Sequence, residues 1–408
     1  MPVYQRGILY GNSSIREVSA IGLGELIAIT SNKYLAGPFI IKITGPLLRI
    51  VGDRNPSAVK IAIIQTLGLI LSKGGPSLRA FVPQFQTTFF KALSDPSRQV
   101  RTEAIKSLAL LMPLSMRVDP LIKELVLNAS GKGSASPAES SAGAIAIQTA
   151  TLEALSVVLK HGGKKAKTKE SIPSALDVGK EMLFHEDEGI RVGASKVIAS
   201  ASELLETDYI EDSLIDLIIS VPLSDSVNVK HGKACACRRV FASTKGSSFS
   251  DDIIDTAAGA IKDLLNDESN LVREAACLAI GAVLGASSDT SKLLQRFEST
   301  LLKCLNPKES MDVLRNMARG LSILIRLTPG VFDGEQGLKI FDAALANAMS
   351  GNQRVQLAFN DFLWLALNVK EGDAGLTRYT NVAMFESSKK MKALYSKVLV
   401  RIKDVEED

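Results

Sequence analysis

The chain has 408 residues, more than one hydrophobic core usually supports, so a single compact globule is not expected. Hydrophobic residues make up 46% and aromatic residues only 5%, a composition that favours packed helices over a β-sandwich. The formal net charge of +4 is too small to indicate a general affinity for polyanions, and four cysteines do not suggest a disulfide framework. No uncharged apolar run reaches the roughly 18 residues that span a bilayer, and the first residues lack the order of a signal peptide. We therefore expect a cytoplasmic protein that does not enter a membrane.

A short pattern recurs along the chain: a polar turn, then an aliphatic residue, then an arginine or a lysine. The copy at Asp95–Ala104 reads DPSRQVRTEA, and the copy at Asp267–Ala276 reads DESNLVREAA. The basic residues, which we call the basic column, recur every 39 to 44 residues, with one interval of 90 that covers two periods. They are Arg16, Lys60, Arg101, Arg191, Lys230, Arg273 and Arg315. A fixed period of this length predicts a repeat architecture.

Each period predicts two helices. Phe81–Leu93 has apolar residues at four-residue spacing, which is typical of one helix face. Asp95 then predicts the N-cap of a second helix, with Pro96 at its first position. The missing unit is expected at Ile147–Ala150 and a ninth unit at Arg354–Ala358. The fold class is therefore predicted as all-α, a HEAT/armadillo-type solenoid of about nine helical hairpins.

Three segments interrupt the repeat. Asn128–Gly143 is rich in glycine and serine and predicts a flexible loop, and Gly162–Glu170 (GGKKAKTKE) predicts a short basic loop. Residues 389–408 predict a terminal helix and an acidic tail. We therefore expect the solenoid to occupy residues 1–388.

No motif for catalysis, a metal or a cofactor is present. The sequence lacks a phosphate-binding GxxxxGK[ST] loop and a GxSxG nucleophile elbow. Cys235 and Cys237 lie two positions apart, so on a helix they point to different sides, and we expect both to be buried small apolar residues. The sequence predicts a protein that is not an enzyme and that uses no cofactor and no small-molecule substrate.

The basic residues allow two interpretations. Stacked repeats place the column residues one above another, where each can hydrogen-bond the turn aspartate of its own or a neighbouring unit. The other interpretation is a ridge that contacts a partner. Arg98 is different from the column residue Arg101, because the other units have no basic residue at its position. We expect Arg98 to be exposed and to be the better candidate for a protein contact.

The basic loop contains four lysines, namely Lys164, Lys165, Lys167 and Lys169. They form either a solvated surface loop or a contact for RNA phosphates, since clustered lysines serve sequence-independent phosphate binding.

Ile43–Ala104 resembles the C-terminal HEAT region of the general-control translational activator family, and in particular a plant member. LFHEDEGIRVGAS (Leu183–Ser195) and VNVKHGKA (Val227–Ala234) extend the resemblance. It is dense from about Gly22 to Gly131 and looser to about Met349. Because full-length members are far longer, we expect a fragment or a truncated product.

The resemblance implies a non-catalytic scaffold. In that family the C-terminal repeats bind the RWD domain of the amino-acid-starvation stress kinase, which phosphorylates the α subunit of translation initiation factor two. Other regions of those proteins contact ribosomes. The family also implies one critical basic residue in these repeats, for which Arg101, Arg191 and Lys230 are candidates beside Arg98. The expected location is cytoplasmic and partly ribosome-associated, through the full-length protein.

Two other hypotheses remain open at this point. One is a ribosome- or RNA-binding module that uses the basic loop. The other is a generic HEAT adaptor for protein assembly or transport.

Overall fold

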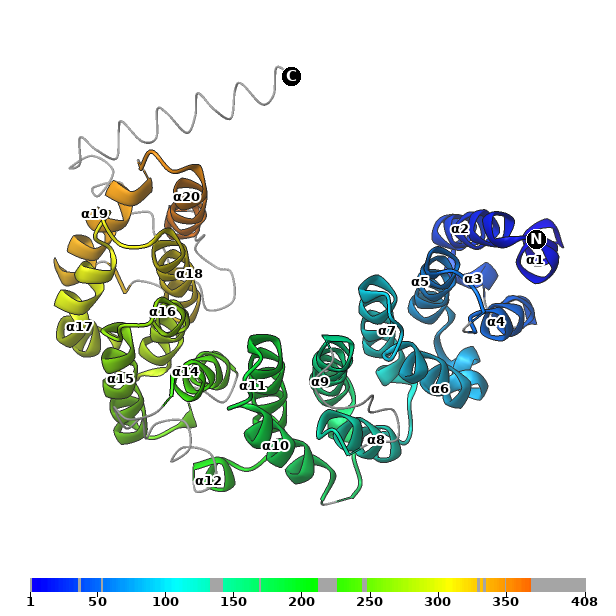
Figure 1. Cartoon of the computed structure of the whole chain (residues 1–408), viewed down its shortest axis with the longest axis horizontal. Helices are drawn as coiled ribbons and strands as arrows, with labels where there is room; N and C mark the ends of the chain where they lie inside the picture. Colours follow the sequence, from blue (N-terminus) through cyan, green and yellow to red (C-terminus); the bar gives the residue numbers. More distant parts are fainter. Residues whose placement is uncertain are drawn as a thin grey trace. The chain divides into compact units, whose positions relative to one another are not determined.

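The computed structural model describes residues 2–35, 38–52, 54–132, 142–168, 170–211, 226–243, 248–328, 331–332, 335–348 and 350–367. Regular structure in these ranges is entirely helical (Figure 1). The chain divides into two compact units, residues 1–206 and 207–408. The helix and tail predicted for residues 389–408 lie outside the described ranges.

The first unit is a series of helical hairpins. Its elements are α1 (Pro2–Tyr10), α2 (Ser13–Ile29), α3 (Asn32–Leu35), α4 (Pro38–Ile50), α5 (Ser57–Gly74), η1 (Gly75–Phe81), α6 (Val82–Ala92), α7 (Arg98–Leu111), η2 (Met112–Leu114), α8 (Asp119–Ala129), α9 (Ala142–Gly162), η3 (Gly163–Lys165), α10 (Ser171–Met182) and α11 (Glu188–Ser202). The hairpins are α1/α2, α4/α5, α6/α7, α8/α9 and α10/α11. Their second helices pack in succession, α2 on α5, α5 on α7, α7 on α9 and α9 on α11.

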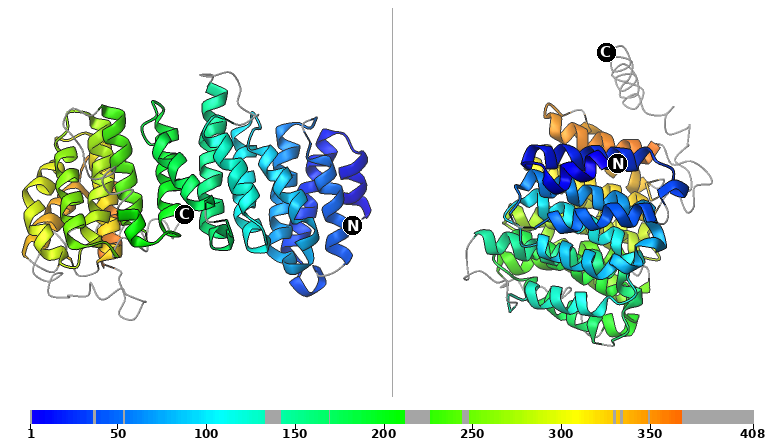
Figure 2. Two further views of the ribbon diagram at one scale, coloured as in Figure 1. Left: turned by 90° about the horizontal axis from the view of Figure 1, so that it is seen from below. Right: turned by 90° about the vertical axis from the view of Figure 1, so that its right-hand side faces the viewer.

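The second unit repeats this arrangement. Its elements are α12 (Thr207–Ile210), α14 (Val227–Phe241), α15 (Asp251–Leu265), α16 (Asn270–Ala286), α17 (Thr290–Cys304), α18 (Met311–Leu327), α19 (Glu335–Ala348) and α20 (Gln353–Leu367). α14, α16, α18 and α20 pack in succession, and α15, α17 and α19 form a second row beside them. Within each unit the helices of a row lie side by side (Figure 2). Across the described ranges, nine second helices carry the repeat, so the predicted all-α solenoid of about nine hairpins is confirmed.

Small and aromatic residues set the packing of these rows. The alanines three positions after the column residues are all fully buried, at Ala104, Ala194, Ala276 and Ala318. Where α16 crosses α18, a Cβ on Gly281 would lie 1.8 Å from the Gly320 carbonyl oxygen, so only glycine permits this approach. In α6, Phe85 and Phe89 are buried and their rings stack with centroids 5.7 Å apart. The helix predicted at Phe81–Leu93 is thus present, one residue shorter at each end.

The predicted N-cap of α7 is wrong. The N-cap position is Ser97, and α7 begins at Arg98 rather than at Pro96. Asp95 instead closes the turn before the helix, because its Oδ1 accepts a hydrogen bond of 2.9 Å from the Ser97 N–H. Its second carboxylate oxygen, Oδ2, accepts a hydrogen bond of 2.7 Å from Lys60 Nζ of the preceding repeat.

Both predicted loops overlap helices at their ends. α8 continues to Ala129 and α9 starts at Ala142, so both ends of the loop predicted at Asn128–Gly143 are helical. Residues 133–141 lie outside the described ranges. In the basic loop, Gly162 ends α9 and Gly163–Lys165 forms η3.

Two stretches, Ser57–Ala92 and Ala142–Lys165, have the length and apolar composition of membrane-spanning helices. The first contains α5, which packs between α2 and α7, and the second contains α9, which packs between α7 and α11. A helix that contacts a neighbour on each side is expected to be apolar around most of its circumference. Helix packing therefore accounts for both compositions.

Candidate functional site: the basic column and the inter-repeat turns

Three column arginines bind the turn that precedes their own helix. Arg101 Nη1 donates to the carbonyl oxygens of Asp95 at 2.8 Å and Pro96 at 2.9 Å. Arg191 Nη1 donates in the same way to His185 and Glu186, both at 2.7 Å. The third is Arg273, which donates to Asp267 at 2.9 Å and Glu268 at 3.1 Å. Each guanidinium reaches back six and five residues, so it fixes the turn at the start of its helix.

Two column lysines reach forward to the next repeat instead. Lys60 Nζ lies 2.7 Å from Asp95 Oδ2, and the two side chains are 11% and 8% exposed. Lys230 Nζ lies 2.8 Å from Asp267 Oδ2, with side chains 15% and 11% exposed. Arg16 makes the corresponding contact without a carboxylate, since it donates to an Asn55 side-chain oxygen at 2.9 Å. These contacts tie α2, α5 and α14 to the turn of the following repeat.

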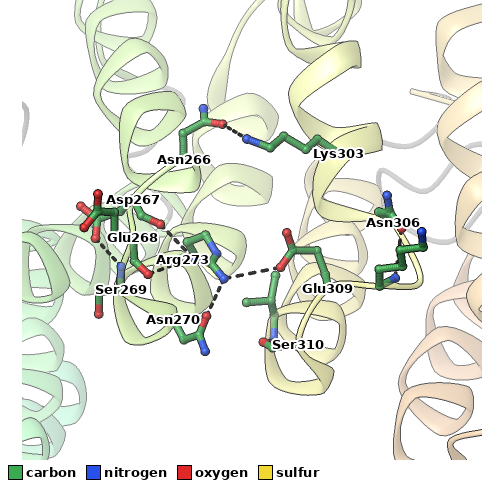
Figure 3. Close-up of polar contacts among 12 residues, drawn as sticks. Asn266, Asp267, Glu268, Ser269, Asn270, Arg273, Lys303, Asn306, Glu309 and Ser310 are labelled. Atoms are coloured by element: carbon green, nitrogen blue, oxygen red, sulfur yellow. Dashed lines mark hydrogen bonds and ion pairs between the residues drawn. The ribbon is translucent and has the colours of Figure 1, made fainter.

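One aspartate therefore joins two basic residues, since Asp267 accepts from Lys230 of the preceding repeat through its side chain and from Arg273 through its carbonyl oxygen. Figure 3 shows the contact with Arg273. Asp267 Oδ1 accepts from the Ser269 N–H at 2.9 Å. Burial by itself would raise the pKa of Asp267. The hydrogen bonds from Lys230 and Ser269, together with the positive charge of Arg273, outweigh burial and hold the pKa below its ordinary value. Arg273 also approaches Glu309 of the next repeat, with Nη2 and Oε2 3.5 Å apart.

The column is less regular at its C-terminal end. Arg315 pairs within its own helix, with Nη1 2.7 Å from Asp312 Oδ1. The ninth unit predicted at Arg354–Ala358 lies in α20, where Arg354 is exposed and Gln356 donates to the Ser350 carbonyl oxygen six residues earlier. A glutamine amide supplies the same N–H donor without a charge.

The four protein-binding candidates differ in access. Arg101 and Arg191 are 8% and 2% exposed, and Lys230 is engaged with Asp267. Arg98 is exposed at the first position of α7, as expected. The structure therefore places the four residues in three helices, α7, α11 and α14, and leaves only Arg98 turned to solvent.

The lysines of the basic loop also separate into two kinds. Lys165 Nζ donates to the carbonyl oxygens of Met112 at 3.0 Å, Pro113 at 2.6 Å and Ser115 at 3.1 Å. It thus closes the carbonyl end of α7 and η2, and the prediction of Lys165 as a solvent-exposed phosphate contact is unsupported. Lys164 and Lys167 are exposed, and Lys169 lies outside the described residues.

Asp119 at the start of α8 holds the same loop in place. Its Oδ1 accepts from the Thr168 N–H at 3.0 Å and from Ser171 Oγ at 2.7 Å, and its Oδ2 accepts from the Lys167 N–H at 3.1 Å. Burial opposes ionisation of this carboxyl, but the hydrogen bonds prevail and lower the pKa of Asp119 to about 2.

The cysteine prediction holds for one residue of the pair. Cys237 is 1% exposed, and burial raises the pKa of its thiol. Cys235 is only half-buried, with its Sγ 3.7 Å from His231 Nε2 one helical turn earlier. In the ranges that the structure covers, no three His, Cys, Asp or Glu residues come together to hold a metal ion.

The row of paired helices and the turn-binding basic residues define a HEAT-type helical-repeat protein. Among solved structures, the Kap95:Nup1 complex contains a chain with a TM-score of 0.60 at 13% identity, and the match covers 100% of this chain and 49% of that one. Kap121p bound to Pho4p gives a TM-score of 0.55 at 14% identity, covering 92% and 40%. At this level of identity the likeness concerns the fold.

Sequence comparison defines the family. Residues 119–408 match the family model described as stalled ribosome sensor GCN1-like, HEAT repeats. The chain is 30% identical to Protein ILITYHIA of Arabidopsis thaliana, a match that covers 88% of this chain and 13% of that protein. It is 31% identical to the stalled ribosome sensor GCN1 of Mus musculus, covering 75% and 11%. It is 35% identical to the eIF-2-alpha kinase activator GCN1 of Saccharomyces cerevisiae, covering 55% and 8%.

The chain therefore belongs to the GCN1-like HEAT-repeat family, and its similarity to the Arabidopsis protein agrees with the plant-type resemblance in the sequence. It spans 13% or less of the length of these curated relatives.

Proposed function

We propose that this chain is a non-catalytic scaffold that binds the RWD domain of the amino-acid-starvation stress kinase. Binding promotes activation of the kinase on ribosomes and leads to phosphorylation of the initiation factor two α subunit. The observation that carries the proposal is the match of residues 119–408 to the GCN1-like family model. The relatives of this chain include a protein named eIF-2-alpha kinase activator. The protein acts in the cytoplasm, where ribosomes and the kinase meet.

Arg98 is the residue that we assign to this contact. A cation at the first position of a helix faces the positive end of the helix dipole, which costs about 0.3–1 kcal/mol. The neighbouring positive charge of Arg98 also adds to the burial effect that lowers the pKa of Arg101. Both local effects oppose a guanidinium at position 98, so the stability of the fold does not explain why an arginine is there. A contact with a carboxylate of a protein partner would explain it.

Arg101 has the opposite character, because its guanidinium satisfies two turn carbonyls. Removal of the side chain leaves both acceptors without their donor, at a cost of about 1–3 kcal/mol. Arg101→Ala is thus expected to lower the melting temperature and to weaken binding through the displaced turn. Arg98→Ala is expected to leave the melting temperature unchanged or slightly higher.

The test measures binding of a purified RWD domain to the whole chain by calorimetry, with melting temperatures for each variant. Arg98→Ala should weaken binding at least about tenfold, as expected for a charged contact worth about 1.4 kcal/mol. Lys91→Ala, an exposed cation in the last turn of α6, is the matched control and should bind like the unmodified chain. No binding at micromolar concentration by the folded chain would refute the proposal, and equal loss in Arg98→Ala and Lys91→Ala would refute the role of Arg98.

A further inference from the structure

Three short helices form one edge of the first unit. η1, η2 and η3 each follow a second helix, namely α5, α7 and α9. η1 contacts η2, and η2 contacts α9, from which η3 continues. Lys165 in η3 is hydrogen-bonded to the carbonyl oxygens of Met112 and Pro113 in η2. Three successive turns are therefore joined into one surface, which we call the η edge.

The η edge carries unpaired positive charge. In the three turns, comprising residues 75–81, 112–120 and 160–171, the exposed cations are Arg79, Arg117, Lys160, Lys164 and Lys167. None of them makes an ion pair with another residue of the described ranges. Lys160 has a local explanation, since it lies in the last turn of α9, where a cation is favoured. Arg79 and Lys164 lie in the last turns of the short helices η1 and η3, whereas Arg117 and Lys167 lie outside the helices.

The carboxylates described in these turns form no ion pair with the exposed cations and are outnumbered by them. Asp119 accepts its hydrogen bonds from two backbone N–H groups and the Ser171 hydroxyl rather than from a cation. Glu170 is the other acid described in these turns, and it is exposed. The basic column at the opposite ends of the helices contrasts with this, because there Lys60 and Lys230 are matched to Asp95 and Asp267.

We propose that the η edge binds the phosphodiester backbone of an RNA duplex. Stacked helical hairpins lie roughly 10 Å apart, so the cations of three turns extend over roughly 20 Å of a rigid edge. A rigid polyanion can meet such a row without ordering a flexible chain. The aromatic rings described in the three turns are those of Phe81, which is only half-exposed, and His161. Successive unpaired bases therefore lack a row of rings on which to stack, which favours contacts to the backbone of a duplex.

This inference is independent of the proposed kinase contact. It also changes the membership of the RNA site predicted from the basic loop. Lys165 leaves the site because its ammonium is engaged by carbonyl oxygens, and Arg79 and Arg117 join it from two other repeats.

The test measures binding of a fluorescent RNA duplex of about 20 base pairs to the whole chain, at salt concentrations from about 50 to 200 mM. The edge variant carries Arg117→Glu, Lys164→Glu and Lys167→Glu, with Lys165 unchanged so that the turn contacts remain. The matched control carries Arg54→Glu, Lys91→Glu and Lys132→Glu. These three residues are also exposed cations of the first unit, and they lie outside the three turns. Circular dichroism checks that both variants remain folded.

The edge variant should bind at least about tenfold more weakly at the lowest salt, and its log–log salt slope should fall by about 2–3. The control should stay within about twofold of the unmodified chain. Equal weakening of both variants would show that net charge, rather than the η edge, sets the affinity and would overturn the proposal. So would an edge variant that binds like the unmodified chain. Displacement of the duplex by polyglutamate at matched charge would also overturn it, in favour of an acidic protein partner.

Discussion

Lys165 provides the sharpest test of how this solenoid uses its cations. Lys165→Met keeps the aliphatic part of the side chain and removes the ammonium. Three carbonyl oxygens, those of Met112, Pro113 and Ser115, then lose their donor at the end of α7 and η2.

The magnitude follows from the burial of those acceptors. A hydrogen bond to a charged group contributes about 1.5–3 kcal/mol, but three bonds that share one ammonium do not add in full. Pro113 is exposed, so water can replace the donor at its carbonyl, whereas Met112 and Ser115 are buried. We therefore expect Lys165→Met to lower the free energy of unfolding by about 2–3 kcal/mol. Lys164→Met, whose side chain is exposed, should change it by less than about 0.5 kcal/mol.

Urea unfolding followed by circular dichroism measures both variants. An internal replicate exists in α5, where Lys73 Nζ donates to carbonyl oxygens at the end of α2, including Ile27 at 2.9 Å and Thr30 at 3.0 Å. Lys73→Met should therefore cost about as much as Lys165→Met. The reasoning is refuted if Lys164→Met and Lys165→Met have unfolding free energies that agree within about 0.5 kcal/mol.

Three further predictions concern a pH window, a helix crossing and an ion pair. The pKa of Asp119 in the folded chain is about 2, below its ordinary value of 3.8. The ionised Asp119 carboxylate therefore stabilises the fold above pH 3.8, and this stabilisation is lost as the pH falls toward 2. Urea unfolding across this range should show a smaller pH dependence in Asp119→Asn than in the unmodified chain. Gly281→Ala places a methyl group 1.8 Å from a backbone oxygen of α18 and should destabilise the chain by about 3 kcal/mol. Gly259→Ala meets no atom within 4 Å and should stabilise α15 by about 0.5–1 kcal/mol. Equal melting temperatures of the two variants would contradict this prediction. Lys60→Met leaves the buried Asp95 carboxylate without its ammonium partner and should lower the free energy of unfolding by about 3 kcal/mol. Adding Asp95→Asn should restore most of this loss, which a double-mutant cycle would measure.

The repeat architecture was accessible from the sequence because its determinants are local. A polar turn, an aliphatic residue and a basic residue occupy about ten neighbouring positions, and their period survives in the linear sequence. Arg101 and Arg191 bind carbonyl groups five and six residues away, so their role is encoded within one such window. Even so, the pattern misplaced the start of α7. A carboxylate at Asp95 serves a turn or an N-cap equally well, and only the contact from Lys60 in another repeat decides between them.

The candidate sites depended on tertiary structure to a greater degree. Lys164 and Lys165 are adjacent residues of the same type, and no local pattern separates them. Lys165 lies within reach of carbonyl groups about 50 positions earlier, and Lys164 remains in solvent. In the same way, Arg79 and Arg117 are isolated cations in the sequence and join the basic loop along one edge only when the three turns stack. The sequence by itself therefore determined the paired helices, their period and the positions of the turns between them. Tertiary packing decided which cations remain available for a partner, because a charge satisfied by distant carbonyl groups is indistinguishable in sequence from one that is exposed.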